Sequence, residues 1–157
     1  MAWLEGSALG HAMRDSGPWT YAIVNLTHIL GVSSLFGAVV ILDLRLLGVW
    51  KRIPLAPLTD AASAVAIVGF AVAATSGLGL IATKATEYIG NPFLYVKFPA
   101  IAAGVTNAVA VRFTSAWQAR AVRELSASEQ HRLAWIGAAS LACWLTAVAA
   151  GRLIAYW

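Results

Sequence analysis

The sequence predicts an all-α protein: an integral membrane four-helix bundle with a short N-terminal interfacial helix. The chain has 157 residues, of which 60% are hydrophobic and only 11% are charged, whereas an average soluble domain is about a quarter charged. Four long apolar stretches cover residues 21–42, 61–82, 93–111 and 133–150. Each is close to the ~20 residues that a helix needs to cross the hydrocarbon layer. The rest is short connections, so we expect one four-helix transmembrane domain over residues 1–157.

Residues 1–15 read as the interfacial helix. Trp3 and Leu4 belong to its apolar side, and Glu5 and Arg14 belong to its polar side. A short amphipathic helix of this kind lies in the plane of the membrane surface, with its apolar face toward the acyl chains. The segment is therefore expected to lie on the bilayer and not to cross it.

The four spans are expected at about residues 20–48, 60–83, 92–113 and 130–154. Thr59 or Asp60 is a candidate cap for the second span. Asn91 is the expected cap of the third span, with Pro92 at its first position. Pro99 should kink that span, because proline removes one helical hydrogen bond. Residues 126–129 read Ser-Ala-Ser-Glu, which fits a capping box for the fourth span.

Basic residues gather on one side of the predicted bundle. They lie at the end of the first span, in the first loop and in the third connection: Arg45, Lys51, Arg52, Arg112, Arg120, Arg123 and Arg132. The positive-inside rule makes this side cytoplasmic, so both termini face outward. The net charge of +4 is explained by this orientation, and we expect the lipid bilayer and no nucleic acid as a partner.

Three ionisable residues lie inside otherwise apolar spans: His28, Lys97 and Arg152. Counted at about 1.5 Å per residue from the cytoplasmic basic residues, all three fall in the outer leaflet, within about a turn and a half of one another. Ionisable groups within a membrane are costly and usually functional. His28, Lys97 and Arg152 are therefore the candidate site of this protein.

This arrangement suits an anionic, largely apolar ligand, and haem b is one example. His28 would bind the iron, while Lys97 and Arg152 would neutralise the propionates. A quinone or a lipid head group could use the same cations. The alternatives are that the two cations reach for lipid head groups and that His28 is a packed histidine bonded to a carbonyl.

Further residues belong to this candidate cofactor site. Gly77 and Gly79 in the second span would let a flat ligand approach the backbone. Asn25 lies one turn from His28 and is expected to fix its tautomer. Tyr156 lies one turn from Arg152.

Copper is the alternative cofactor. His11, Met13 and His28 all lie on the outward side and supply nitrogen and sulfur ligands suited to Cu(I). The competing reading is that His11 and Met13 rest at the interface. His131 lies on the cytoplasmic side and cannot join this group.

The remaining polar residues of the spans are expected to be structural. Asp43 and Arg45 should join Arg112 in an ion-pair network, and Asn107 should form a hydrogen bond between helices. No set of catalytic residues appears, and whether the chain is an enzyme stays open.

Three blocks carry a resemblance to known families. They are residues 28–48, with His28-Ile-Leu-Gly31 and Leu42-Asp-Leu-Arg-Leu-Leu-Gly48, residues 91–97 and residues 151–156. Together they resemble an uncharacterised family of small four-helix bacterial membrane proteins. More distantly, the pattern is similar to the membrane domain of the copper-resistance protein CopD and to the small four-helix protoporphyrinogen oxidases. The oxidase resemblance implies haem b at His28, with Arg45 and Lys97 at matching positions, and the CopD resemblance implies copper handling.

These observations predict a multi-pass protein of the bacterial inner membrane with both termini periplasmic. The first functional hypothesis is a haem-b protein that passes electrons between a periplasmic partner and a quinone. The second is copper uptake or handling, and the third is a non-catalytic subunit of a larger membrane complex or a homo-oligomer.

Overall fold

The computed structural model describes residues 1–157, except for the side chain of Pro18. The helices are α1 (Ala2–Glu5), α2 (Ala8–Asp15), α3 (Pro18–Leu46), α4 (Leu55–Thr83), α5 (Pro92–Ala110), α6 (Ser115–Ala119) and α7 (Ala127–Leu153). Two 3₁₀ turns, η1 (Val111–Phe113) and η2 (Ile154–Tyr156), extend α5 and α7. Four helices are long and apolar enough to cross a membrane. The predicted all-α four-helix bundle is confirmed.

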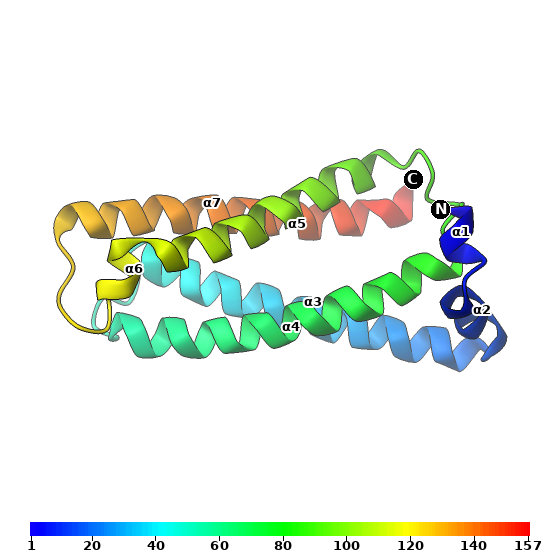
Figure 1. Ribbon diagram of the computed structural model, residues 1–157, viewed down its shortest axis with the longest axis horizontal. Helices are drawn as coiled ribbons and strands as arrows, with labels where there is room; N and C mark the ends of the chain where they lie inside the picture. The colour runs from blue at the N-terminus through cyan, green and yellow to red at the C-terminus, as the bar shows by residue number, and fades with distance from the viewer.

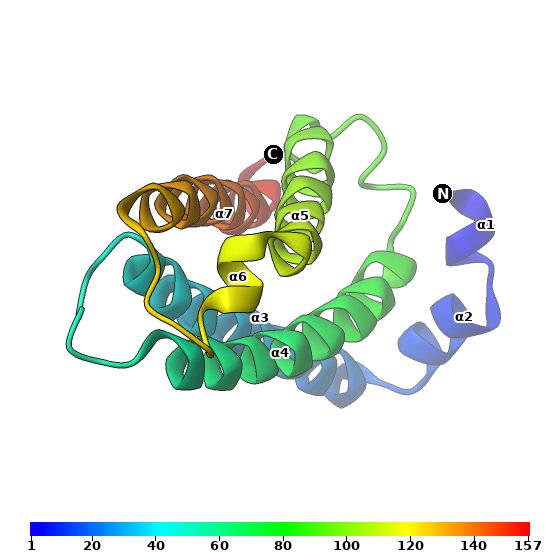
Figure 2. The ribbon, with the colours of Figure 1, turned by 60° about the vertical axis from the view of Figure 1, so that its left-hand side comes forward.

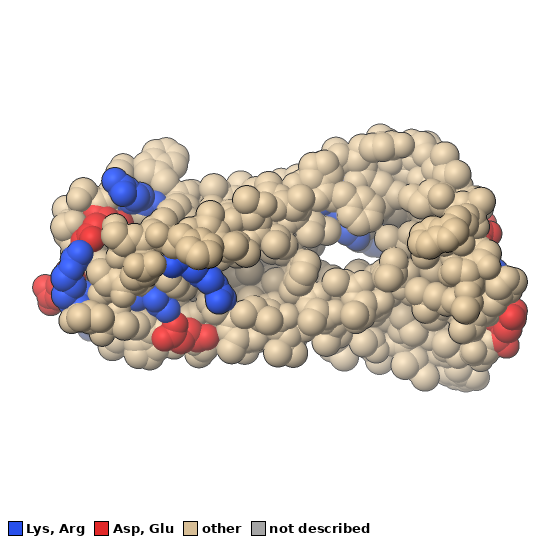
Figure 3. Space-filling model, in the orientation of Figure 1, with Lys and Arg blue, Asp and Glu red and all other residues tan. Residues whose placement is uncertain are grey.

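The long helices form two antiparallel pairs, α3 with α4 and α5 with α7 (Figure 1). The pairs meet along α3 and α7, whereas α4 and α5 make no extended contact. We call the end with both termini, α1 and α2 the terminal end. The opposite end, with α6 and the loops at residues 47–54 and 120–126, is the basic end. Lys and Arg side chains are most abundant at the basic end (Figure 3).

Glycines set how closely the helices approach one another. A Cβ on Gly31 would lie 2.7 Å from the backbone nitrogen of Ala73, and one on Gly69 would lie 2.6 Å from that of Leu35. These contacts bring α3 and α4 together along their length. A Cβ on Gly137 would lie 3.0 Å from the Leu46 Cβ, so α7 approaches α3 closely at the basic end.

The N-terminal segment forms two short helices instead of the single predicted one. The helix is interrupted at Gly6 and Ser7. The Ser7 hydroxyl caps α2 by accepting a hydrogen bond from the Gly10 amide at 3.3 Å. The Glu5 carboxylate accepts hydrogen bonds from the amide of Thr86 at 2.8 Å and from its hydroxyl at 2.6 Å. The segment is thereby fastened to the connection that follows α4 (Figure 2).

The helix caps agree with the sequence at two places and differ at a third. Asn91 caps α5 by accepting from the Phe93 amide at 3.0 Å, and Ser126 forms the predicted capping box with Glu129. The predicted cap at Thr59 or Asp60 is wrong, because α4 already begins at Leu55. Proline is tolerated in a first helical turn, so Pro57 does not delay the helix. The side chains of Thr59 and Asp60 instead bind Arg120.

Candidate functional site

His28 lies on α3 and turns its imidazole toward α4. Its Nδ1 lies 2.9 Å from the carbonyl oxygen of Ala73 and 3.3 Å from the Ser76 hydroxyl. A carbonyl can only accept a hydrogen bond, so Nδ1 carries the proton in this geometry. The Nε2 atom then holds the free lone pair, which is the state in which a neutral imidazole binds a metal.

The neighbours that hold His28 differ from those expected. The backbone carbonyl of Ala73, and not Asn25, fixes the tautomer. Gly77 makes room for the imidazole, since a Cβ there would lie 2.9 Å from the His28 Cε1. Gly79 lies beside Met13, whose Sδ is 3.5 Å from the ideal Cβ position, an ordinary van der Waals distance. The predicted contact of both glycines with a flat ligand stays a prediction.

Lys97 lies on α5, in the other helix pair. Its half-buried side chain runs along α7, where Nζ is 3.3 Å from the ideal Cβ position of Gly151. Within the described residues, its ammonium group has no ion pair or hydrogen bond.

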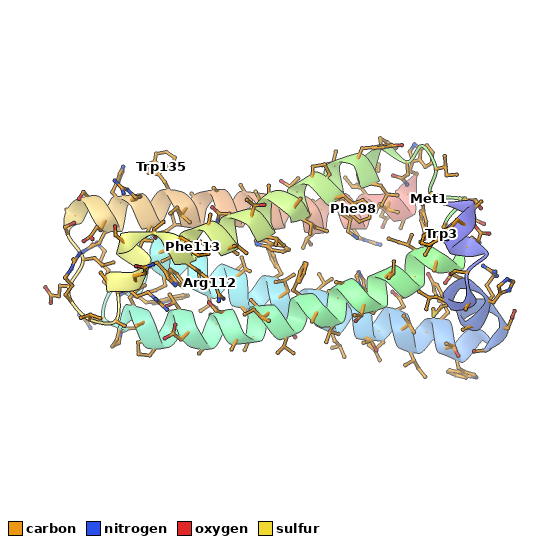
Figure 4. All side chains as sticks on the ribbon, in the orientation of Figure 1. Met1, Trp3, Phe98, Arg112, Phe113 and Trp135 are labelled. Atoms are coloured by element: carbon orange, nitrogen blue, oxygen red, sulfur yellow. The ribbon has the colours of Figure 1, made fainter. Side chains whose placement is uncertain are left out.

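The two helix pairs separate in this half of the molecule. Figure 3 shows an opening between them toward the terminal end, with a basic side chain on its wall. The labelled Phe98 lies on α5 in the same half (Figure 4) and is partly exposed. His28 lies in the α3–α4 pair and Lys97 in the α5–α7 pair, so each helix pair contributes one ionisable residue to this half of the bundle.

Arg152 lies closer to the surface of the terminal end. Its Nη2 donates to the Tyr156 hydroxyl at 2.5 Å, and its guanidinium lies 4.7 Å from the centroid of the Tyr156 ring. Both side chains are exposed. This pair therefore sits where the apolar span gives way to the more polar end of the bundle.

The candidate copper ligands occupy different surroundings. His11 is exposed, with its Nδ1 3.9 Å from Asp15 Oδ2. Met13 is buried against Gly79 and Val24. Among the described residues, no three His, Cys, Asp or Glu side chains are placed to hold one metal ion.

Two polar residues expected to be separate from the site are indeed separate. His131 accepts a hydrogen bond from the Trp135 indole at 2.9 Å, near the basic end. The Asn107 amide donates to the Ile136 carbonyl at 3.1 Å and links α5 to α7, as the sequence predicts.

The predicted ion-pair network at the basic end is wrong. Arg45 Nε donates to the Ile53 carbonyl at 3.0 Å, because the loop after α3 folds back over the guanidinium. Asp43 is only 1% exposed, and its Oδ2 has no hydrogen-bond partner among the described residues. Arg112 forms no ion pair in the same set. Asp43 and Arg112 instead border a cavity of about 500 Å³ between the helix pairs.

Sequence reasoning missed two parts of this picture. The Ala73 carbonyl has no sequence signature, because every residue carries one. Asp43 did have a signal, since it is an acidic residue next to the apolar run that ends the first span. Its position two residues before Arg45 favours the ion-pair interpretation, but the loop after α3 engages Arg45 instead.

The fold and these residues define a small four-helix membrane protein with polar groups at two levels of its bundle. Residues 1–157 match the model of a "Family of unknown function (DUF6644)", and the chain belongs to that family. No curated protein and no solved structure matches the chain. The expected membership of an uncharacterised family is confirmed, whereas the resemblances to CopD and to the oxidases gain no support from these comparisons.

Proposed function

We propose that the chain binds haem b in the terminal half of the bundle, where His28 would bind the iron, and that it transfers electrons. The observation that carries the proposal is the orientation of His28. Its Nδ1 is engaged by the Ala73 carbonyl at 2.9 Å, which leaves Nε2 to bind a metal. Metal-binding histidines usually donate their other ring N–H to a carbonyl or carboxylate in this way.

The charges nearby fit the acidic edge of a haem. Lys97 would pair with one propionate, because its ammonium group has no other partner in the described chain. Its side chain runs between helices along Gly151, which favours a ligand in the bundle over a lipid head group outside it. Arg152 would pair with the second propionate from the terminal end, with Tyr156 supporting its guanidinium.

When bound, haem b supplies reversible one-electron chemistry. The protein's residues hold it, neutralise its acidic groups and keep water away with apolar helices. The expected electron partners are a periplasmic protein on the terminal side and a quinone in the membrane, in the orientation that the positive-inside rule gives to a bacterial inner membrane. An uptake role for copper finds less support, because His11 is paired with Asp15 and Met13 is packed against Gly79.

An absorption spectrum of the detergent-purified protein tests the proposal. We expect a Soret band and a pyridine haemochrome of the b type. His28→Ala should abolish both, because it removes the iron ligand. The carbonyl bond of His28 would equally hold a purely structural histidine, and the spectrum separates the two roles.

The chain offers matched controls in its two other histidines. His11→Ala and His131→Ala remove exposed imidazoles outside the site and should keep the Soret band. Lys97→Gln and Arg152→Gln should keep the band but lose haem several-fold faster in a transfer assay to apomyoglobin. Wild-type protein that is colourless after expression with a haem precursor contradicts the proposal.

A further inference from the structure

The basic half of the bundle contains a second candidate site, which nothing in the haem proposal uses. A cavity of about 500 Å³ lies between the two helix pairs, within the ~300–1,000 Å³ range of small-molecule sites. Its walls are mostly apolar and include the aromatic side chains of Phe70, Trp117 and Trp144. Because α4 and α5 make no extended contact, a lipid-soluble molecule can reach it from the side.

One oxygen of a carboxyl group in this cavity lacks a hydrogen-bond partner. Asp43 is 1% exposed and lines the cavity, and its Oδ2 accepts no hydrogen bond in the described residues. Ser140 of α7 lies against the same carboxyl group. Buried polar atoms nearly always have a partner, so an unpaired carboxyl oxygen at a cavity wall indicates a bound hydrogen-bond donor.

The charge of the cavity limits the kind of donor. Arg112 of η1 also lines it, and its side chain is labelled between the ribbons of α5 and α4 in the view of Figure 4. The guanidinium disfavours a cationic ligand, and together with the carboxyl group it leaves the site without a large net charge. The aromatic walls favour a flat ring, since aromatic pairs gain from stacked or edge-to-face contacts.

We infer that this cavity binds a neutral, lipid-soluble aromatic molecule with a hydroxyl group, of the phenol or quinol type, whose hydroxyl donates a hydrogen bond to Asp43. Arg112 donates to an oxygen on the far side of the ring. The ligand ring packs against the aromatic pair of Phe70 and Trp144, whose ring centroids are 6.1 Å apart. This inference does not depend on haem binding, because it uses none of the residues near His28.

Calorimetric titration of the full-length protein in detergent tests the inference with three probes. They are a decyl-substituted benzoquinol, its dimethyl ether, which has the same ring but no donor, and decylammonium, which is a cationic donor. The wild-type protein should bind the quinol at least about tenfold more tightly than the ether, because the ether leaves the carboxyl unpaired. It should bind decylammonium more weakly than the quinol.

Asp43→Leu should equalise the affinities for the quinol and the ether, a result that a purely structural role of Asp43 would not produce. Asp60→Asn is the matched control, since Asp60 pairs with Arg120 outside the cavity, and it should keep the full discrimination. Ala66→Phe places a bulky ring in the cavity from α4 and should weaken both probes about tenfold or more. Ala64→Phe, on an exposed face of the same helix, should change neither.

Four results would overturn the inference, and none needs the Asp43 variant to fold. They are equal wild-type affinities for the quinol and the ether, preferential binding of decylammonium, unchanged binding in Ala66→Phe, and no binding of any probe. Retained discrimination in a folded Asp43→Leu protein would also overturn it. Absence of a Soret band would overturn the haem proposal and leave this inference standing.

Discussion

The two halves of the bundle are built from the same four helices but present opposite chemistry. Toward the terminal end, the helix pairs separate, and each pair holds one ionisable side chain: His28 against α4 in the first pair and Lys97 against α7 in the second. Toward the basic end, α7 approaches α3 through Gly137, and the charged residues that line the cavity are Asp43 and Arg112. The first region suits an acidic ligand, and the second suits a hydrogen-bond donor.

The difference shows that small residues determine where each region can form. Gly31 and Gly69 hold α3 against α4, whereas Gly137 holds α7 against α3 only near Leu46. The pairs are therefore joined at one end and free to separate at the other. Polar residues in the terminal half therefore have different neighbours, and a different spacing of the helix pairs around them, from those in the basic half.

The largest expected effect comes from the contact that holds the first pair together. Gly31→Val should lower the free energy of unfolding by about 3 kcal/mol, because overpacking of a tight contact typically costs 1–3 kcal/mol and occasionally more. The new Cβ would lie 2.7 Å from the Ala73 nitrogen, and backbone cannot move aside as a side chain can. Reversible denaturation in mixed micelles measures the change.

Gly37→Ala is the matched control on the same helix, since no atom lies within 4 Å of its ideal Cβ position. It should be neutral or stabilise the protein by up to about 1 kcal/mol, the difference in helix propensity. Equal destabilisation by both variants would show that α3 and α4 do not pack through Gly31.

Asp43→Leu should stabilise the protein by about 1–3 kcal/mol, the usual penalty of an unpaired buried polar group. Leucine has a similar size and fits the apolar walls around Phe70 and Trp144. Asp60→Leu should have the opposite sign and cost less than about 1 kcal/mol, because it removes a partly exposed ion pair with Arg120. Thermal unfolding of the ligand-free proteins measures both, and destabilisation by Asp43→Leu would show that the carboxyl is satisfied.

Gly77→Ala tests the terminal half with a smaller change. The added Cβ would lie 2.9 Å from the His28 Cε1, so the ring must shift, at a cost on the order of 1 kcal/mol. In haem-loaded protein, the Soret maximum should move. In Gly151→Ala the nearest atom is the flexible end of Lys97 at 3.3 Å, and the maximum should stay in place.

The smallest effect concerns the N-terminal segment and depends on pH. Hydrogen bonds from the side chain and backbone of Thr86, with smaller contributions from Arg14 and Lys84, lower the pKa of Glu5 below its ordinary value. The stabilisation by this carboxylate is therefore complete above the ordinary pKa and is lost as the pH falls through the lowered pKa of the folded state.

The protection factors of the α2 amides, which correct for the intrinsic pH dependence of exchange, should accordingly fall below about pH 4.5, the ordinary value for glutamate, while those in the centre of α7 stay unchanged. Glu5→Gln should expose α2 to faster exchange already at neutral pH and remove the pH dependence. An unchanged pH profile in that variant would assign the effect to another group.

The fold could be predicted from the sequence because its determinants are local. Hydrophobic length sets the spans, Asn91 and Ser126 set two helix starts, and the basic residues mark one end. The start of α4 could not be predicted from Thr59 and Asp60, because the partner that takes their side chains, Arg120, is distant in the sequence. A polar side chain can cap a helix or bind a residue that is distant in the sequence, and the local sequence does not distinguish these two roles.

The candidate sites were only partly predictable for a related reason. His28, Lys97 and Arg152 stand out because ionisable residues are rare in apolar spans. The partner of His28 could not be found in this way, since the backbone carbonyl of Ala73 has no signature in the sequence. The cavity beside Asp43 depends on α4 and α5 staying apart, which follows from how two helix pairs pack and not from any single span.

The bond between Glu5 and Thr86 has a consequence for the order in which the molecule is assembled. Its two residues are 81 positions apart, so α1 and α2 are synthesised before α3 but can dock only after α4 and the following connection exist. Contacts between distant positions form late, because their chain segments must first be brought together. During that interval, the apolar residues of α2 are free to rest on the membrane surface. Docking of α1 and α2 therefore requires that the first membrane-spanning hairpin, α3 with α4, is complete.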